Sequence, residues 1–273
     1  MDELQIAFIG AGNMATSIIG GLIEQGMPAS NLRASDPFPE SLQRLQQTAP
    51  ITTSAENSEV VAGADVVILA VKPQVMAQVT RDISAAVSAA NAVVISIAAG
   101  ITIASLQAGL GEPTAIVRCM PNTPALLRAG ATALYANAST SEQQRISAGD
   151  ILAAVGSVCW VEQEEQLDAV TALSGSGPAY FFLFMEAMTE AGAKLGLDEA
   201  TSRDLALQTG LGACRMATEG DVDLRELRRR VTSPGGTTES AVQSFEKANL
   251  RGIVAAAMQA ALDRAREMSR EMG

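Results

Sequence analysis

Histidine is absent from this chain of 273 residues, which removes the side chain most used for proton transfer near neutral pH and for metal binding. Aromatic residues make up only 3%, so small and aliphatic residues must fill the core. Cysteine occurs three times, at separated positions without metal-ligand spacing. We therefore expect no metal site, no disulfide framework and three small, buried or near-buried cysteines in a reducing compartment.

Positive charge is also scarce, because 19 basic residues against 30 acidic ones leave a net charge of −11. Such an acidic chain is a poor partner for nucleic acid or an anionic membrane, and we expect it to bind neither. No apolar run is long enough to cross a bilayer, and MDELQIAFIG lacks the pattern of a signal peptide. We expect a cytoplasmic protein.

The most informative segment that is present is IAFIGAGNMA, residues 6–15. It has the form G-x-G-x-x-A between a predicted strand and a predicted helix. Gly10 permits the tight turn, and Gly12 lets the backbone approach a pyrophosphate at the N-terminus of the helix. The pattern predicts dinucleotide binding, and the alternative is a glycine-rich turn without a ligand.

Short apolar segments alternate with helical patterns through the first half of the chain, which predicts a parallel, doubly wound sheet. The predicted strands are Gln5–Ile9, Asn31–Ser35, Val66–Ala70, Val93–Ile97, Ala115–Cys119, Ala131–Tyr135 and Ser157–Val161. The predicted helices between them are Met14–Gln25, Glu40–Thr48, Glu56–Ala62, Gln74–Ala86, Ile103–Gly109 and Ser141–Val155.

From residue 163 onward only helical patterns occur, and they are rich in alanine, glycine and methionine. They are Gln163–Leu173, Pro178–Leu195, Glu199–Glu219, Leu224–Val231, Thr238–Lys247 and Arg251–Met272. The expected fold class is α/β: a Rossmann-type sheet domain, 1–162, followed by an all-α domain, 163–273. Because so few helices cannot bury all their apolar faces alone, we expect the second domain to pair with a second copy.

Ligands in this class of sheet bind at the carboxyl ends of strands, and three further strand ends carry unusual residues. Pro73 of AVKP suits the first turn of a helix, and Lys72 is either a solvated charge or a cofactor contact. Ala98 and Ala99 leave room for a flat ring. RCMPNTP, residues 118–124, has two prolines that predict a rigid turn.

Asp36 ends the second predicted strand, where an acid can bind a ribose 2′-OH and favour NADH over NADPH. It can equally cap the next helix, with Pro37 as that helix's first residue. Arg33 and Ser35 suit a 2′-phosphate instead, so these residues leave the choice of cofactor open.

Two segments of the helical half are too glycine-rich for ordinary helix, LSGSGPAYFF and TSPGGTTESA. In the second, Gly235-Gly236 leads into a helix start at Thr237-Thr238, which predicts an anion site suited to a carboxylate. The alternative for both segments is a helix break with capping.

FIGAGNMA, AVKPQ, RCMPNTP, DAVTALSGSGPAYFF and TSPGGTTESA together resemble the pyrroline-5-carboxylate reductase family, in order and spacing, over the whole chain. The last two motifs are the specific ones. The resemblance implies reduction of Δ1-pyrroline-5-carboxylate to L-proline by NADPH or NADH, the last step of proline biosynthesis. It also implies a homodimer, which often assembles further into a decamer.

The resemblance implies site residues as well. The pyrophosphate would lie on Ile9, Gly10, Ala11, Gly12, Asn13 and Met14, and the adenosine side on Asn57. Asp36, a candidate cofactor residue from its place at a strand end, departs from the family here. The nicotinamide half would lie on Ala70, Val71, Lys72, Pro73, Ala98 and Ala99. The substrate would be held by Glu164, Gly236, Thr237 and Thr238, with the Thr238 hydroxyl as the catalytic group at the ring nitrogen. Many relatives have serine in place of Asp36, whose charge would weaken binding of a 2′-phosphate.

The missing histidine fits this reaction, because a cyclic imine is basic enough to be protonated before hydride arrives, and catalysis is then mainly positioning. One rival is a β-hydroxyacid dehydrogenase, which would need a lysine base, and Lys194 is the candidate. The other is a nucleotide-binding regulator without catalysis, which would have no need of the small-anion site in TSPGGTT.

Overall fold

The protein, represented here by a computed structural model, is described for residues 3–272 and divides into two compact units. The first, the sheet unit, runs up to Ser176 and takes in the chain from Ala261 onward. The second, the helical unit, is Gly177–Ala260. These compact units do not test the domain boundary that the sequence predicts between residues 162 and 163, which stays a prediction.

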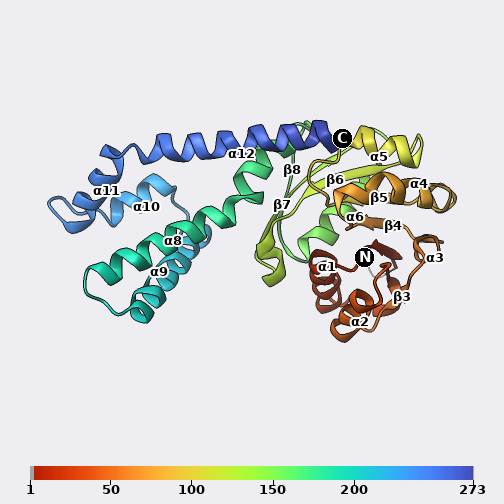
Figure 1. Cartoon of the computed structure of the whole chain (residues 1–273), viewed down its shortest axis with the longest axis horizontal. Coiled ribbons are helices and arrows are strands. Elements are labelled where there is room, and N and C mark those ends of the chain that lie inside the picture. Colours follow the sequence, from red (N-terminus) through yellow and green to blue (C-terminus); the bar gives the residue numbers. More distant parts are fainter. Residues whose placement is uncertain (1–2, 273) are drawn as a thin grey trace. The chain divides into compact units, whose positions relative to one another are not determined.

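The sheet unit contains one eight-stranded sheet in the order β3-β2-β1-β4-β5-β6-β7-β8 (Figure 1). Its strands are β1 (Ile6–Ile9), β2 (Leu32–Ser35), β3 (Thr52–Ser54), β4 (Val66–Leu69), β5 (Val93–Ser96), β6 (Ile116–Met120), β7 (Gly130–Ala136) and β8 (Gly156–Trp160). Every predicted strand is present within a residue or so of its expected ends. Strand β3 was not predicted, because its three polar residues give no apolar signal at this edge of the sheet.

The parallel arrangement is confirmed for β1 to β6, whereas β7 pairs with β6 in the antiparallel sense. The chain between β6 and β7 contains only a 3-10 helix, Thr123–Leu127, and a parallel return would need a crossover of a dozen or more residues. The prolines predicted to make a rigid turn in RCMPNTP thus lead into a reversal of the chain.

Helices cover both faces of this sheet, because successive strand residues point to opposite sides. Ile6 and Phe8 of β1 belong to one core with helix α1, while Ala7 and Ile9 belong to another with α4 and α5. The helices of the unit are α1 (Asn13–Glu24), α2 (Pro39–Thr48), α3 (Asn57–Val61), α4 (Pro73–Ala90), α5 (Ile103–Leu110), α6 (Glu142–Ala153), α7 (Gln166–Val170) and the end of α12 (Leu250–Met272).

The helical unit contains α8 (Gly177–Lys194), α9 (Glu199–Glu219), α10 (Leu224–Arg230), α11 (Thr237–Lys247) and the beginning of α12. Helices α8 and α9 form an antiparallel hairpin, in which Ser202 donates a hydrogen bond to the Thr189 carbonyl and lies against Gly192. The expected all-helical second half is confirmed from α7 onward. Within residues 3–272 no helix is both long and apolar enough to span a bilayer.

Candidate functional site

The glycine loop lies at the point where the strand order reverses, between β1 and its neighbours β2 and β4. Gly10 has a φ of +100°, and a Cβ there would lie 2.6 Å from the Ala70 carbonyl oxygen, so only glycine fits. Gly12 is the N-cap of α1, has open space around its Cα, and no side chain caps the helix. The first N–H groups of α1 therefore remain open to an anion, which fits a pyrophosphate.

The predicted residues of this loop run from the last residue of β1 to the second residue of α1. They are Ile9, Gly10, Ala11, Gly12, Asn13 and Met14. Gly12 and Asn13 are exposed, while Ile9, Gly10 and Ala11 are buried. The buried residues build the turn, and the exposed ones present the backbone that a ligand can reach.

Asp36 does not cap helix α2, so that interpretation is wrong: the N-cap is Phe38 and the first residue is Pro39. Its two carboxylate oxygens instead accept hydrogen bonds from the N–H of Ala11 and the N–H of Phe38, both at 2.9 Å. Asp36 thus ties the glycine loop to the turn after β2. Its predicted contact with a ribose is untested.

The two residues suggested for a 2′-phosphate have partners within the protein. Arg33 Nη1 donates to the Ala62 carbonyl at 2.9 Å, and the buried Ser35 hydroxyl donates to Asn57 Oδ1 at 2.7 Å. Asn57 is the first residue of α3, and this bond fixes its amide beside the end of β2. Its predicted contact with the adenosine side is compatible with that place.

The residues predicted for the nicotinamide half follow β4 and β5, which lie side by side next to β1. Ala70 donates its N–H to the Ile9 carbonyl at 2.8 Å, so the ends of β1 and β4 are held together. Pro73 is the first residue of α4, as predicted, and Lys72 before it is exposed. Ala98 and Ala99 follow β5 with one residue between, and Ala98 is buried in the core on one face of the sheet. The predicted cofactor residues thus share one edge of the sheet, as binding of an extended dinucleotide requires.

Two sequence motifs meet beyond the end of β6. Asn122 of RCMPNTP donates to the Ser174 carbonyl at 3.0 Å and accepts from the Ala131 N–H at 2.9 Å. Ser174 belongs to the glycine-rich LSGSGP, which forms a π-helical turn, Thr171–Gly175, instead of a clean break. A Cβ on Gly175 would lie 2.8 Å from the Met120 methyl, so glycine here allows close packing on β6.

Glu164, predicted for the substrate pocket, lies in a buried charged cluster that the sequence did not reveal. Its Oε1 accepts from Arg118 Nη1 at 2.9 Å and from the Ile103 N–H at 2.8 Å. Arg118 in β6 is only 5% exposed, and its Nη2 lies 3.9 Å from Asp168. The signal that could have found this cluster is one arginine within an otherwise apolar strand, since a buried guanidinium needs carboxylate partners.

The predicted anion site of the helical unit has the expected backbone. Gly235 has a φ of +72°, Gly236 is the N-cap of α11, and no side chain caps this helix. The hydroxyls of Thr237 and Thr238 are exposed and have no hydrogen-bond partner within residues 3–272. Glu239 accepts from the Gly235 N–H at 2.8 Å, so a carboxylate ligand would share this helix end with a side-chain carboxylate.

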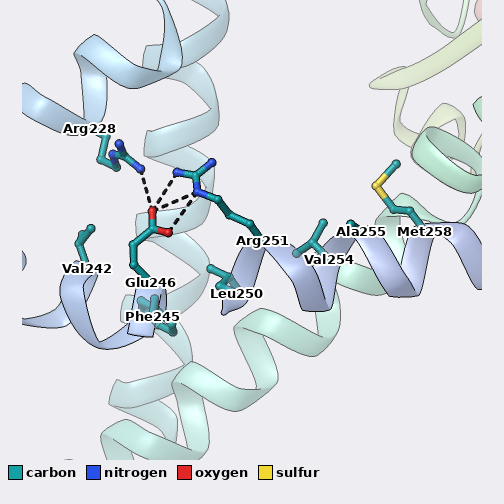
Figure 2. A pocket seen from close by; sticks show the side chains of 9 residues that line it. All are labelled: Arg228, Val242, Phe245, Glu246, Leu250, Arg251, Val254, Ala255 and Met258. Carbon is teal, nitrogen blue, oxygen red and sulfur yellow. Dashed lines mark hydrogen bonds and ion pairs between the residues drawn. The ribbon is translucent and has the colours of Figure 1, made fainter. Parts of the chain in front are cut away.

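The helical unit also has an open pocket of about 630 Å³ along α10, α11 and the start of α12 (Figure 2). Its lining is mainly apolar and includes Val242, Phe245 and Val254. Figure 2 shows Arg228 and Arg251 both pointing at the Glu246 carboxylate. The hydrogen bond from Arg251 holds the pKa of Glu246 below its ordinary value. Because its polar groups already pair with one another, this pocket suits an apolar occupant.

A strand order of 3-2-1-4-5-6 with an uncapped glycine loop at the reversal point defines a dinucleotide-binding domain of the Rossmann type. Comparison with known proteins agrees. Residues 5–100 match the family model described as NADP oxidoreductase coenzyme F420-dependent. Residues 164–268 match the model described as pyrroline-5-carboxylate reductase dimerisation.

Whole-chain comparisons identify the particular family. The pyrroline-5-carboxylate reductase of Pseudomonas aeruginosa is 53% identical over 100% of both chains, and that of Haemophilus influenzae is 46% identical over 98% of both. The solved structure of the Coxiella burnetii enzyme covers 97% of this chain and 98% of its own, with 43% identity and a TM-score of 0.95. The Plasmodium falciparum structure with NADP bound has 29% identity and a TM-score of 0.85, covering 98% and 99%.

The chain belongs to the pyrroline-5-carboxylate reductase family. It is an NAD(P)H-dependent oxidoreductase that reduces Δ1-pyrroline-5-carboxylate to L-proline, and the predicted function is confirmed. The two rival interpretations are thereby set aside. A 3-hydroxyisobutyrate dehydrogenase of Mycobacterium tuberculosis has only 18% identity and a TM-score of 0.51, which is a likeness of fold alone.

Proposed function

We propose that the dinucleotide lies along the edge formed by the ends of β2, β1, β4 and β5. The open N–H groups at the N-terminus of α1 would hold the pyrophosphate over Ile9–Met14. Asp36 and Asn57 would contact the adenosine side, and Ala70–Pro73 with Ala98–Ala99 would line the nicotinamide half. The support for this path is that all these residues follow adjoining strands of one sheet.

We further propose that Gly236, Thr237 and Thr238 hold the substrate carboxylate and ring. The observation that carries this proposal is the uncapped N-terminus of α11 with two exposed hydroxyls that have no partner within residues 3–272. Glu164 is assigned to the substrate pocket as well. Its Oε2 has no partner in the described part of the chain, so one oxygen is left to accept a hydrogen bond.

In this reaction the side chains mainly orient the substrate relative to the cofactor. When bound, the reduced nicotinamide supplies the hydride that reaches the carbon of the C=N bond. The ring nitrogen arrives already protonated, so no side chain of this chain has to donate a proton. The Thr238 hydroxyl would accept the N–H hydrogen bond of the iminium and fix which face of the ring is presented.

We propose a homodimer formed through the helical unit, with TSPGGTT near helices of the partner, and further assembly of dimers into a decamer. The support is the apolar surface that this unit leaves exposed on α8 and the apolar pocket of Figure 2. We also propose that the enzyme works in the cytoplasm, where a reducing environment suits three cysteines that are all unpaired.

Steady-state kinetics of Thr238→Ala test the substrate assignment. We expect kcat/KM for pyrroline-5-carboxylate to fall roughly tenfold or more, about 1.4 kcal/mol, with little change in the KM for cofactor. Thr238→Ser keeps the hydroxyl and should retain most of the activity. Ser244→Ala, also exposed on α11, is the matched control. Wild-type kcat/KM in Thr238→Ala would remove this threonine from the site.

A further inference from the structure

The last turns of α12 lie within the sheet unit and contact two separate parts of it. Ser269 donates a hydrogen bond to Asp168 Oδ1 at 3.3 Å. Met272 packs against the core that contains Ala98, Ile101 and Ile103. The end of this helix therefore touches both the α7 region and the segment after β5.

That segment, residues 97–102, connects β5 to α5, and we call it the β5–α5 loop. Gly100 in its middle has a φ of +77°, and a Cβ there would lie 2.9 Å from the Met272 methyl and 3.4 Å from Met268 Cβ. Helix α12 therefore packs directly on the loop at Gly100, whose positive φ favours glycine.

The charged cluster of Glu164, Arg118 and Asp168 is bonded to the end of the same loop. Glu164 accepts from the N–H of Ile103, the first residue after the loop, and from Arg118. Arg118 is held in this arrangement, because a buried guanidinium that loses its carboxylate partners is strongly destabilising. Asp168 lies near Arg118 and accepts from Ser269, so the charged cluster and the end of α12 form one connected support.

We propose that Arg118, Ser269 and Met272 are positioning residues for the reduction, because they fix the β5–α5 loop and with it Ala98 and Ala99. This rests on the proposed function, in which these two alanines line the nicotinamide half. Hydride transfer depends steeply on the distance between donor and acceptor, so a loop free to shift lowers the rate of that step. The carboxyl-terminal turns of α12 thus act on a site that they need not touch.

The first test measures the loop without cofactor or substrate. Amide hydrogen exchange over residues 98–103 should be about tenfold faster in Ser269→Ala and in Met272→Ala than in the wild type. Arg264→Ala is the matched control, because within residues 3–272 the ion pairs of this exposed arginine of the same helix end are with Glu267 and Glu271 only. Unchanged exchange in both variants would show that the end of α12 does not hold the loop.

The second test measures catalysis. We expect Ser269→Ala and Met272→Ala to lower kcat about fivefold and to raise the primary deuterium isotope effect with deuterated NADPH. The Kd for NADP⁺, from titration calorimetry, should stay unchanged, since the proposed pyrophosphate site lies elsewhere. Ser269→Thr keeps the hydroxyl and should restore kcat. A merely structural residue would lower Tm and leave the isotope effect as it was, and that result would overturn the proposal.

A third variant tests the proposed nicotinamide site by itself, so that its failure can be told apart from failure of the positioning role. Ala99→Leu places a large side chain where the nicotinamide is proposed to lie, and should weaken binding of NADP⁺ and lower kcat. Wild-type binding and kcat in this variant would refute the nicotinamide assignment itself. Weakened binding in Ala99→Leu together with unchanged kcat in the α12 variants would refute only the positioning role.

Discussion

At the scale of single residues, the Asp36 carboxylate acts in two ways, through a hydrogen bond and through its charge. The carboxylate holds the Ala11 N–H of the glycine loop, yet it also brings a negative charge to the end of β2. The charge would repel a 2′-phosphate, while the hydrogen bond would help to preform the loop. Removing the carboxylate should therefore change the binding of both NADPH and NADH, because the loop loses a hydrogen bond. The loss of charge should change the binding of NADPH alone.

We predict that Asp36→Ser raises the ratio of kcat/KM for NADPH to that for NADH, because only NADPH gains from losing the charge. Steady-state kinetics with both cofactors measure this ratio. Asp65→Ser is the control, since Asp65 also accepts a backbone hydrogen bond, from Gln5, but lies at the opposite end of the parallel strands. If the ratio stays constant, Asp36 only ties the loop and the choice of cofactor is made elsewhere.

Cys119 allows a second prediction at this scale. The expected burial of the cysteines is confirmed for Cys119 and wrong for Cys159 and Cys214, which are exposed. Cys119 lies in β6, and its Sγ donates to the Ser96 carbonyl at 3.4 Å. Burial disfavours the thiolate and raises the pKa of Cys119 to about 12, although the nearby Arg118 lowers it somewhat. Alkylating reagents attack the thiolate, so Cys119 should stay unmodified at pH 8 while the exposed Cys159 reacts. Mass spectrometry of labelled native enzyme checks this; rapid labelling of Cys119 would contradict its burial.

At the scale of elements, the capping of α6 shows how local sequence starts a helix. Ser141 accepts from the N–H of Gln144 at 3.3 Å, and the Gln144 side chain accepts from the N–H of Ser141 at 2.9 Å. This reciprocal pair satisfies N–H groups that otherwise lack partners at a helix start. The sequence prediction placed this helix start correctly to within one residue.

We predict that Ser141→Ala destabilises the protein by about 1 kcal/mol, because one of these N–H groups loses its acceptor. Thermal unfolding at a fixed protein concentration should show a Tm lower by about 2–4 °C. Ser84→Ala is the matched control, since in the described part of the chain the Ser84 hydroxyl bonds only to the Arg81 carbonyl within α4, and its loss should be nearly neutral. An equal loss of Tm in both variants would mean that the cap adds nothing.

The elements also show how far sequence reasoning reaches. Apolar strands and periodic helices are local patterns, so nearly all of them were predicted. The direction of β7 and the π-helical turn at Thr171–Gly175 depend on loop length and on packing against β6, which no single segment encodes. The glycine turn after β1 and the start of α4 at Pro73 could be predicted because glycine and proline have specific backbone roles. Arg118 was missed because its partners, Glu164 and Asp168, lie far along the chain.

At the scale of the whole molecule, the helical unit exposes more apolar surface than a lone unit should. Phe181, Phe182 and Leu183 of α8 are 62%, 63% and 66% exposed, and Leu211 of α9 is 56% exposed. Contiguous apolar surface of this kind normally marks an interface, and the name of the matched family model, dimerisation, points the same way. A second copy of the chain presents the same apolar surface, so a two-fold symmetric dimer would cover the apolar surfaces of both subunits.

We predict that the enzyme has no stable monomer at micromolar concentration, which sedimentation equilibrium can test. Leu211→Glu should break the assembly and abolish activity, because a charge buried in an apolar interface is costly and the active site is proposed to lie near that interface. Leu127→Glu changes an equally apolar residue of the sheet unit that is 85% exposed, and should leave both assembly and kcat intact. A folded, fully active monomer, of the wild type or of Leu211→Glu, would contradict the obligate dimer and the interfacial active site together.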